Sequence, residues 1–276
     1  MSLGLTVYRM AATLAQPVVG LALRRRRAAG REDPARLGER LGRAGWDRPA
    51  GCLVWVHAAS LGEALSVLPL VAALRATPAA PAVLVTTVTT TSAALLAARL
   101  PPGALHQYAP VDTPAAVRRF LAHWRPDLAV LVESELWPTL LTEAWRSGVR
   151  TALVNGRMSA RSERRWRWAP RTAATLLAGL DVCLACSPAQ ADRLRRLGAT
   201  QARCVGDLKT AAPLLPAAAA GLAAADLTAL RAAAGGRQAG RDAGGLRSAP
   251  GWQPAGAGLP AQPGREPGRL GRLARG

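Results

Sequence analysis

Lysine, histidine and aromatic side chains are scarce in this sequence of 276 residues, although its formal net charge is +19. Arginine supplies nearly all of the positive charge, because Lys209 is the single lysine. The histidines His57, His106 and His123 lie far apart and lack the close spacing that zinc ligands need. The sequence therefore predicts no metal site.

Cysteine is also rare, and the four cysteines lie in or beside apolar runs, at Cys52, Cys183, Cys186 and Cys204. This placement favours reduced, buried thiols in a cytosolic compartment over a disulfide framework. Cys183 and Cys186 form a C-x-x-C pair, but a redox pair of this kind lies at the N-terminus of a helix. Residues 181–187 are typical of a strand that ends in a turn, which disfavours redox or metal chemistry.

The large surplus of positive charge indicates a polyanionic partner, such as nucleic acid, anionic lipid or a phosphorylated substrate. The sequence has no RNA- or DNA-binding motif, and most of its basic residues lie outside any aromatic platform on which bases could stack. We therefore expect no nucleic-acid partner. An anionic lipid or a phosphorylated substrate fits the charge better.

An apolar run at residues 3–23 is followed directly by four arginines at 24–27. The run has nearly the length of a membrane span, but it contains Arg9, Gln16 and Pro17. A cleavable signal peptide would carry its charges before the apolar run. We predict a membrane-associated helix and basic block at 1–30, spanning or interfacial, with the body on the cytoplasmic face of the inner membrane. A soluble amphipathic helix is the alternative.

Short β-rich runs alternate with helical stretches between residues 52 and 205, and the runs are apolar on both faces. This pattern predicts a Rossmann-like, doubly wound parallel α/β sheet within a domain at 31–216. The expected strands are 52–57, 82–88, 105–109, 128–132, 151–154, 182–185 and 202–205. The expected helices are 62–75, 91–100, 114–124, 137–147, 158–179 and 188–197.

The pattern fades after residue 210. Residues 217–234 are rich in alanine and are typical of a helix or linker. Residues 235–276 consist mainly of glycine, proline, arginine and alanine, with no apolar period. Such a segment buries too little surface to offset its ordering entropy, so we expect a disordered tail.

Polar clusters follow four of the expected strands at the point where each strand ends. They are HAASLGE at 57–63, VESELWP at 132–138, NGRMS at 155–159 and GDLK at 206–209. Ligands of doubly wound sheets bind outside the carboxyl ends of the strands. Because the four clusters would converge on one edge of one sheet, we expect the chemistry to lie there.

Glu63 opens a helix directly after the first core strand, close behind Ser60 and Gly62. A carboxylate at this place could take a proton from an attacking hydroxyl as a general base. A glutamate that only stabilises the helix N-terminus is the alternative. We expect Gly62 to let the backbone turn tightly. Glu133 and Glu135 emerge from another apolar strand, and helix capping explains Glu135 better than Glu133.

An arginine-rich stretch follows the turn at Asn155 and Gly156, and it also contains Trp166 and Trp168. The guanidinium fork matches phosphate oxygens, which favours a phosphate-binding or membrane-contacting face. A solvated basic helix is the alternative. The arginines concerned are Arg157, Arg161, Arg164, Arg165, Arg167 and Arg171.

These clusters, with GERL at 38–41 and LVTT at 84–87, resemble the 3-deoxy-D-manno-octulosonic acid (Kdo) transferases of lipopolysaccharide synthesis, which form glycosyltransferase family 30. The motifs occur in the family's order and at close to its spacing. The resemblance extends over residues 1 to about 230. It implies a two-domain GT-B fold whose N-terminal domain contacts the membrane and holds a lipid A precursor, and whose C-terminal domain holds CMP-Kdo.

The resemblance also implies a transfer that inverts the anomeric centre and needs no metal or other cofactor besides the donor CMP-Kdo. By this resemblance Glu63 is the general base on the acceptor hydroxyl, and Glu133 and Lys209 support the transition state. We assign the arginine cluster to the phosphates of lipid A. The predicted substrate-binding residues are Ser60, Gly62, Asn155, Arg157, Arg161, Arg164 and Arg165.

Nothing after residue 230 matches the family's CMP-binding motifs. We therefore expect a Kdo transferase without its donor domain, inactive alone. The alternative is a non-catalytic membrane-associated protein that binds anionic lipid through its arginine-rich face.

Overall fold

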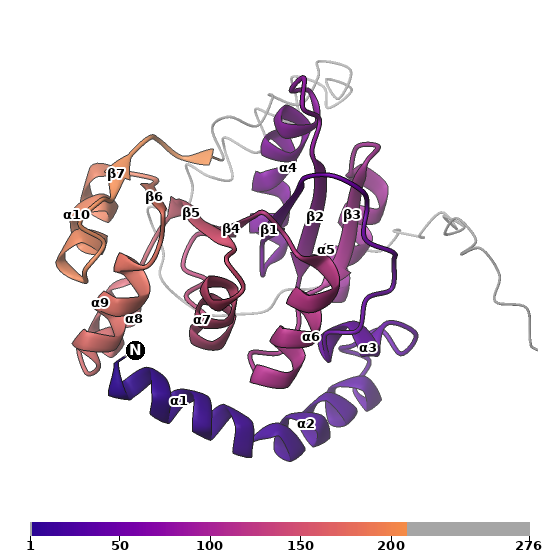
Figure 1. The fold of residues 1–276 in the computed structure, drawn as a ribbon, viewed down its shortest axis with the longest axis horizontal. Helices are drawn as coiled ribbons and strands as arrows, with labels where there is room; N and C mark the ends of the chain where they lie inside the picture. Colours follow the sequence, from indigo (N-terminus) through magenta and orange to yellow (C-terminus); the bar gives the residue numbers. More distant parts are fainter. Residues whose placement is uncertain (1, 209–276) are drawn as a thin grey trace, which may run out of the picture. The chain divides into compact units, whose positions relative to one another are not determined.

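The computed structural model describes residues 2–208, which fold as a seven-stranded parallel sheet between layers of helices (Figure 1). The strand order is β3-β2-β1-β4-β5-β6-β7. This order confirms the predicted Rossmann-like, doubly wound sheet. The strands are β1 (Leu53–His57), β2 (Ala82–Thr87), β3 (Ala104–Tyr108), β4 (Leu128–Val132), β5 (Arg150–Gly156), β6 (Val182–Ala185) and β7 (Arg203–Cys204).

The helices cover both faces of this sheet. Helices α4 and α5 pack on one face, and α6, α7 and α9 pack on the other. The helices are α1 (Leu3–Leu14), α2 (Gln16–Ala28), α3 (Leu37–Arg40), α4 (Leu61–Arg75), α5 (Thr90–Arg99), α6 (Pro114–Trp124), α7 (Pro138–Arg146), α8 (Ala160–Trp166), α9 (Pro170–Ala178) and α10 (Pro188–Arg196). Apart from α1 to α3 and the division into α8 and α9, they lie close to the predicted ranges.

Alternation along the strands divides the core into two clusters. Trp55 and Leu131 lie in the cluster under α6 and α7, whereas Val54, Val56 and Val130 lie in the cluster under α4. Successive side chains of a strand point to opposite faces of the sheet. Because both faces are covered, the strands are apolar throughout, which is the pattern that predicted a parallel sheet.

The expected single helical stretch at 158–179 is wrong, because it forms two helices. Helix α8 ends at Trp166, and α9 begins at Pro170, where a missing backbone N–H costs nothing. Ala169 leaves the helical region because the residue before a proline disfavours it. The break separates the two tryptophans, so that Trp166 packs against the core and Trp168 is 90% exposed.

The N-terminal apolar run also forms two helices, α1 and α2, with Pro17 in the first turn of the second. None of the helices in residues 2–208 combines the length and the apolar character that a membrane crossing requires. Helix α1 packs beside α6, α7 and α9, and its Leu5 is buried in their core. The outward side chains of Leu3, Met10 and Leu14 are largely exposed.

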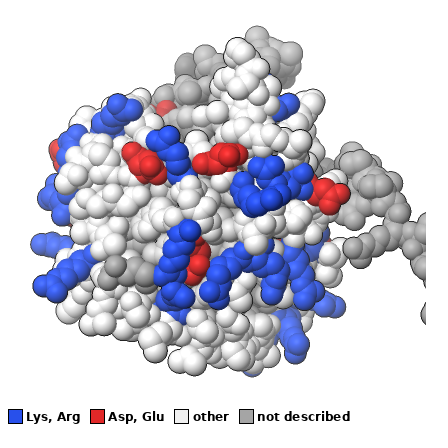
Figure 2. Space-filling model, viewed as in Figure 1, with Lys and Arg blue, Asp and Glu red and all other residues white. Residues whose placement is uncertain are grey.

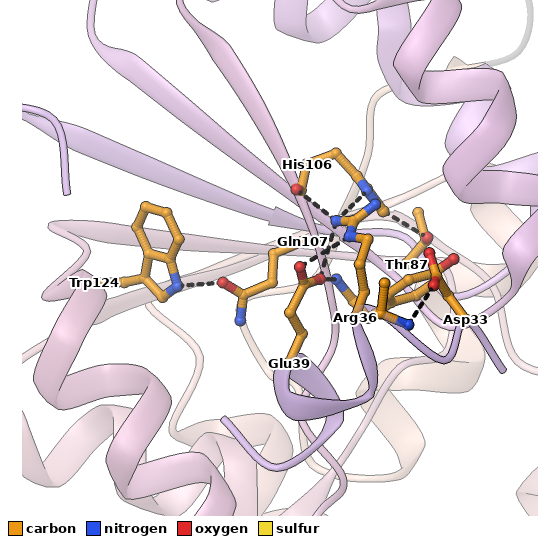
Figure 3. Close-up of polar contacts among 9 residues, drawn as sticks. Asp33, Arg36, Glu39, Thr87, His106, Gln107 and Trp124 are labelled. Carbon is orange, nitrogen blue, oxygen red and sulfur yellow. Dashed lines mark hydrogen bonds and ion pairs between the residues drawn. The ribbon is translucent and has the colours of Figure 1, made fainter. Parts of the chain in front are cut away.

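A buried ion-pair network fastens the segment around α3 to the end of β3 (Figure 3). Arg36 donates to both carboxylate oxygens of Glu39 at 2.9 Å and to the carbonyl of His106 at 3.0 Å. Glu39 accepts the backbone N–H of Tyr108 at 2.7 Å. This segment covers the carboxyl end of the edge strand β3, where unpaired backbone groups would otherwise be open to other chains.

The cysteine prediction is confirmed only in part. All four thiols are free, and Cys183 is buried, but Cys52 and Cys204 are exposed. Cys52 precedes the first residue of β1, and Cys204 lies in the two-residue edge strand β7, so neither reaches the buried middle of the sheet. The predictions for Lys209, for the segment at 217–234 and for the tail at 235–276 lie outside the described residues.

Candidate active site

The strand order reverses between β1 and β4. From β1 the chain moves outward to β2 and β3, and α6 then returns it to β4, from which it continues to β7. Such a switch point opens a crevice, because the loops after the two central strands leave toward opposite faces of the sheet. Here the loop after β1 leads to Glu63, and the loop after β4 carries Glu133 and Glu135. Both predicted carboxylate clusters therefore lie at the switch point.

Glu63 closes a capping box at the start of α4. Its backbone N–H donates to the Ser60 hydroxyl oxygen at 3.3 Å, and that hydroxyl donates to Glu63 Oε1 at 2.8 Å. The backbone N–H of Ala59 donates to Glu63 Oε2 at 2.8 Å. The helix-capping interpretation is thus confirmed. The same contacts fix the direction of the carboxylate, and its role as a base stays a prediction.

The surroundings of Glu63 keep its carboxylate basic. The residue is 7% exposed, and burial raises its pKa. The hydrogen bonds from Ser60 and Ala59 oppose that rise, and the nearby charge of Glu133 adds to it. A raised pKa suits a general base at neutral pH.

Gly62 does not make the tight turn that we predicted. It lies in the first turn of α4 and is absent from the described residues with a positive φ. A β-carbon at this position would meet no heavy atom within 4 Å apart from those of its chain neighbours and its own helix backbone. The surface at Gly62, in the first turn of α4, is therefore open.

Two residues of the site lie in the left-handed region of the backbone. Glu133 has φ 58°, which is rare and strained for a glutamate, and Asn155 has φ 53°, which asparagine adopts more readily. They end the neighbouring strands β4 and β5, where Glu133 N–H donates to the carbonyl of Val154 at 3.1 Å. The carbonyl of Glu133 accepts the backbone N–H of Arg157 at 3.3 Å. Strained residues of this kind cluster at functional sites.

Glu135 and Trp137 join the carboxylates to His57 at the end of β1. The indole N–H of Trp137 donates to Glu135, and its ring meets His57 edge-on with the centroids 5.0 Å apart. His57 Nε2 lies 3.9 Å from Glu135 Oε2. Burial raises the pKa of Glu135, and the charges of Glu63 and Glu133 raise it further against the opposing hydrogen bond from Trp137. Three carboxylates therefore share one neighbourhood.

The hydroxyl of Thr86 connects Trp55 to His57. Trp55 Nε1 can only donate, so the Thr86 hydroxyl oxygen accepts from it at 2.8 Å. The same hydroxyl lies 2.9 Å from His57 Nδ1, on the side of the ring opposite to the Nε2 that faces Glu135. Burial and the charge of Arg40 lower the pKa of His57 to about 4, so the ring is neutral at pH 7.

Asn155 and Arg157 bring the end of the described chain to the same edge. Asn155 Oδ1 accepts the backbone N–H of Leu208 at 3.1 Å, and Arg157 Nη2 donates to Asp207 Oδ2 at 2.7 Å. The predicted convergence of the 155–159 and 206–209 clusters is therefore confirmed as far as Leu208. Lys209 itself is not described.

The arginines of α8 lie apart from this hydrogen-bonded group. Arg161, Arg164 and Arg165 are exposed, and α8 buries none of its residues. Figure 2 shows many basic side chains on one face of the molecule and few acidic ones. The assignment of the α8 arginines to phosphate binding stays a prediction, and a solvated basic helix remains the alternative.

Sequence reasoning missed His57, Trp137 and Thr86 as parts of the site. The first two stand in the motifs at 57–63 and 132–138, so their position at strand ends was a usable signal. Thr86 also stands in a motif of the resemblance, LVTT at 84–87, but its contact with His57 depends on the pairing of the two residues across β1 and β2. Within residues 2–208 no group of three histidine, cysteine or acidic side chains is arranged to hold a metal ion.

A carboxylate group at the switch point of a Rossmann-like sheet is the arrangement expected of an enzyme domain that binds a small polar group there. Residues 35–212 match the family model described as 3-Deoxy-D-manno-octulosonic-acid transferase (kdotransferase). The match covers more than half of the chain and includes every predicted site residue. The chain therefore belongs to the Kdo transferase family.

Curated relatives carry the same family name. The 3-deoxy-D-manno-octulosonic acid transferase of Bordetella pertussis is 40% identical over 75% of this chain and 50% of its own length. A probable mitochondrial Kdo transferase of Arabidopsis thaliana is 40% identical over 60% of this chain and 38% of its own. The 3-deoxy-D-manno-octulosonic acid transferase of Rickettsia bellii is 31% identical over 76% of this chain and 50% of its own length. The chain spans half or less of the length of these curated relatives.

Proposed function

We propose that this chain is the acceptor-binding half of a GT-B Kdo transferase, which transfers Kdo from CMP-Kdo to a lipid A precursor at the cytoplasmic face of the inner membrane. One observation carries the proposal: the Glu63 carboxylate is held by Ser60 and Ala59 at the switch point, close to Glu133. Family membership supports the reaction type.

In the proposed reaction an acceptor hydroxyl gives its proton to Glu63 while its oxygen attacks the anomeric carbon of Kdo. The carbon–oxygen bond to CMP breaks, CMP leaves, and the anomeric centre inverts. Glu63 already accepts two hydrogen bonds, but a carboxylate has about four lone-pair sites, so an acceptor hydroxyl can still bind. Gly62, the residue before Glu63, is exposed and has open space at its α-carbon.

Glu133 and Lys209 are proposed to support the transition state. The backbone strain at Glu133 favours a functional role for it. Leu208, which precedes Lys209 in the sequence, donates its backbone N–H to Asn155 Oδ1. We infer that Arg157, Arg161, Arg164 and Arg165 meet the phosphates of the acceptor. No metal or organic cofactor takes part in this proposal.

Kdo transfer from CMP-Kdo to a lipid A precursor tests the proposal, with binding of the precursor measured by calorimetry. We expect the chain to bind the precursor but to transfer little or no Kdo alone. Glu63→Gln keeps the capping box, because glutamine also serves at that position, so folding should survive. Should transfer occur, it must vanish in Glu63→Gln. Transfer that persists in this variant would show that Glu63 is not the base.

A second candidate function is capture of anionic lipid without catalysis. It is favoured by the exposed arginines of α8 beside the exposed Trp168, and by the exposed apolar side chains of α1. Flotation with vesicles with and without anionic lipid separates the two functions. Electrostatic capture weakens as salt rises and does not discriminate between anionic lipids. Preference for the lipid A precursor over another anionic lipid of equal charge favours the transferase.

A further inference from the structure

A cleft of about 620 Å³ opens between the N-terminal helices and the loops that lead into α6 and α7. One wall carries Ala12, Ala15 and Val19 from α1, α2 and the residue between them. The opposite wall carries Val111, Leu136 and Trp137. Its volume falls within the range of pockets that hold small ligands. The alanines leave this room because they present one methyl group each.

The charged and phenolic groups on the walls have partners within the protein. Tyr8 donates its hydroxyl to Asp112 Oδ2 at 2.9 Å, and Asp112 accepts two backbone N–H groups at the start of α7. Arg40 faces Glu32 at 3.5 Å and donates to the carbonyl of Ala109. A peptide in this cleft would need partners for every one of its own backbone groups on walls made mainly of alanine, valine, leucine, proline and tryptophan side chains. A hydrocarbon chain needs none.

Trp137 connects the cleft to the carboxylate site. One part of its side chain lines the cleft, while its indole N–H donates to Glu135 and its ring edge meets His57. A molecule whose polar part lies at the switch point can therefore extend an apolar part along Trp137 into the cleft. On the outer side, α1 exposes Val7, Met10 and Leu14 to solvent, so an apolar surface continues beyond the cleft.

We propose that this cleft binds one acyl chain of the acceptor lipid while the sugar of that lipid lies beside Glu63. The inference rests on the proposed function and adds a specificity site to it. Arginines 24–27 follow Val19 later in the same helix, so this helix carries positive charge as well as one wall of the cleft. The cleft therefore selects an acylated acceptor and fixes the depth at which its sugar is presented.

Quenching of tryptophan fluorescence by a lipid A precursor with brominated acyl chains tests the proposal in the full chain. Bromine quenches at short range, so Trp137 should lose emission, and Trp137→Phe should remove that part of the quenching from a chain with eight tryptophans. Val19→Phe fills the cleft, whereas Val18→Phe places the same side chain at a neighbouring position that is 67% exposed. We expect Val19→Phe to weaken binding of the precursor about tenfold and Val18→Phe to leave it unchanged.

The deacylated precursor separates this inference from the proposed function. It should bind through its sugar and phosphates, more weakly than the acylated form and equally well to wild type and Val19→Phe. If it binds but acylation adds no affinity, or if Val19→Phe has no effect on the acylated form, the acyl site is wrong and the transferase proposal stands. If neither form binds, the proposed function itself fails. Equal quenching of Trp137 by brominated phosphatidylcholine would show that the cleft takes bulk lipid and would overturn the assignment to the acceptor.

Discussion

The hydroxyl of Tyr8 donates to Asp112 across 104 positions of sequence, at 2.9 Å. The same carboxylate accepts the backbone N–H of Leu140 at 2.8 Å and that of Thr139 at 3.2 Å. One side chain therefore caps α7 and holds α1 against the body. Burial raises the pKa of Asp112, and its hydrogen bonds with Tyr8, Leu140 and Thr139 oppose the rise.

We expect substitutions of Tyr8 and of Asp112 to lower the free energy of unfolding by unequal amounts. Tyr8→Phe removes one hydrogen bond and should cost about 1 kcal/mol in the free energy of unfolding. Asp112→Ala also removes a helix cap and should cost about 2 kcal/mol. Urea unfolding of both single variants and the double variant measures the coupling. A coupling energy near zero would show that the contact does not fasten α1. Hydrogen exchange should report faster opening of α1 in both single variants.

We expect His106 to make stability fall in acid. Burial, followed by the charge of Arg36, lowers its pKa to about 3 in the folded protein, against about 6.5 for an unperturbed histidine. Arg36 can only donate to Nδ1, so the neutral ring keeps its proton on Nε2, facing Thr87 Oγ1 at 2.9 Å.

The direction in which stability changes with pH follows from proton binding by His106. Between pH 6.5 and 3 the unfolded chain takes up a proton that the folded chain refuses, so stability declines as the pH falls through this window. The contribution of His106 is fully present above pH 6.5, and its loss at pH 3 amounts to roughly 4 kcal/mol. Unfolding by urea at several pH values measures the slope. His106→Gln should flatten it, and a slope that is unchanged in this variant would assign the acid sensitivity elsewhere, such as His57.

Gly62→Ala should separate stability from acceptor binding. The added methyl group meets no heavy atom within 4 Å, and alanine favours a helix over glycine, so stability should rise by about 0.5 kcal/mol. If the acceptor approaches Glu63 through this space, the methyl group should weaken binding of the lipid A precursor several-fold. Gly20→Ala is the matched control, because it also has open space in a helix. Unchanged binding in Gly62→Ala would place the acceptor elsewhere.

The sheet was predictable from sequence because its strands are apolar on both faces and end in polar clusters. A local signal also existed for the missed break between α8 and α9, because Pro170 biases Ala169 away from the helix. No local sequence signal predicted the contacts of Tyr8 with Asp112 and of Arg36 with His106. They join residues 104 and 70 positions apart, and their geometry depends on how α1 and α3 pack on the finished domain.

For the candidate site, sequence placed the clusters at one edge but not the contacts inside them. The motif Ser60-Leu-Gly-Glu63 predicts a capping box from spacing alone, and the structure contains it. The partnership of Trp137 with His57 arises because β1 and β4 are neighbours, which follows from the topology and not from either motif.

Ser60→Ala tests whether the capping box sets the basicity of Glu63. The Ser60 hydroxyl donates to the carboxylate and thereby stabilises its ionised form, so its loss should raise the pKa of Glu63, which burial already raises. The variant should also lose about 1 kcal/mol of stability, because the N–H of Glu63 loses its cap. Carbon-13 NMR of labelled glutamate side chains follows the titration. Ser66→Ala is the control, since Ser66 lies on the same helix and donates to the Glu63 backbone carbonyl at 2.8 Å, away from the carboxylate. Equal titration of Glu63 in both variants would mean that the hydroxyl of Ser60 caps the helix without tuning the base.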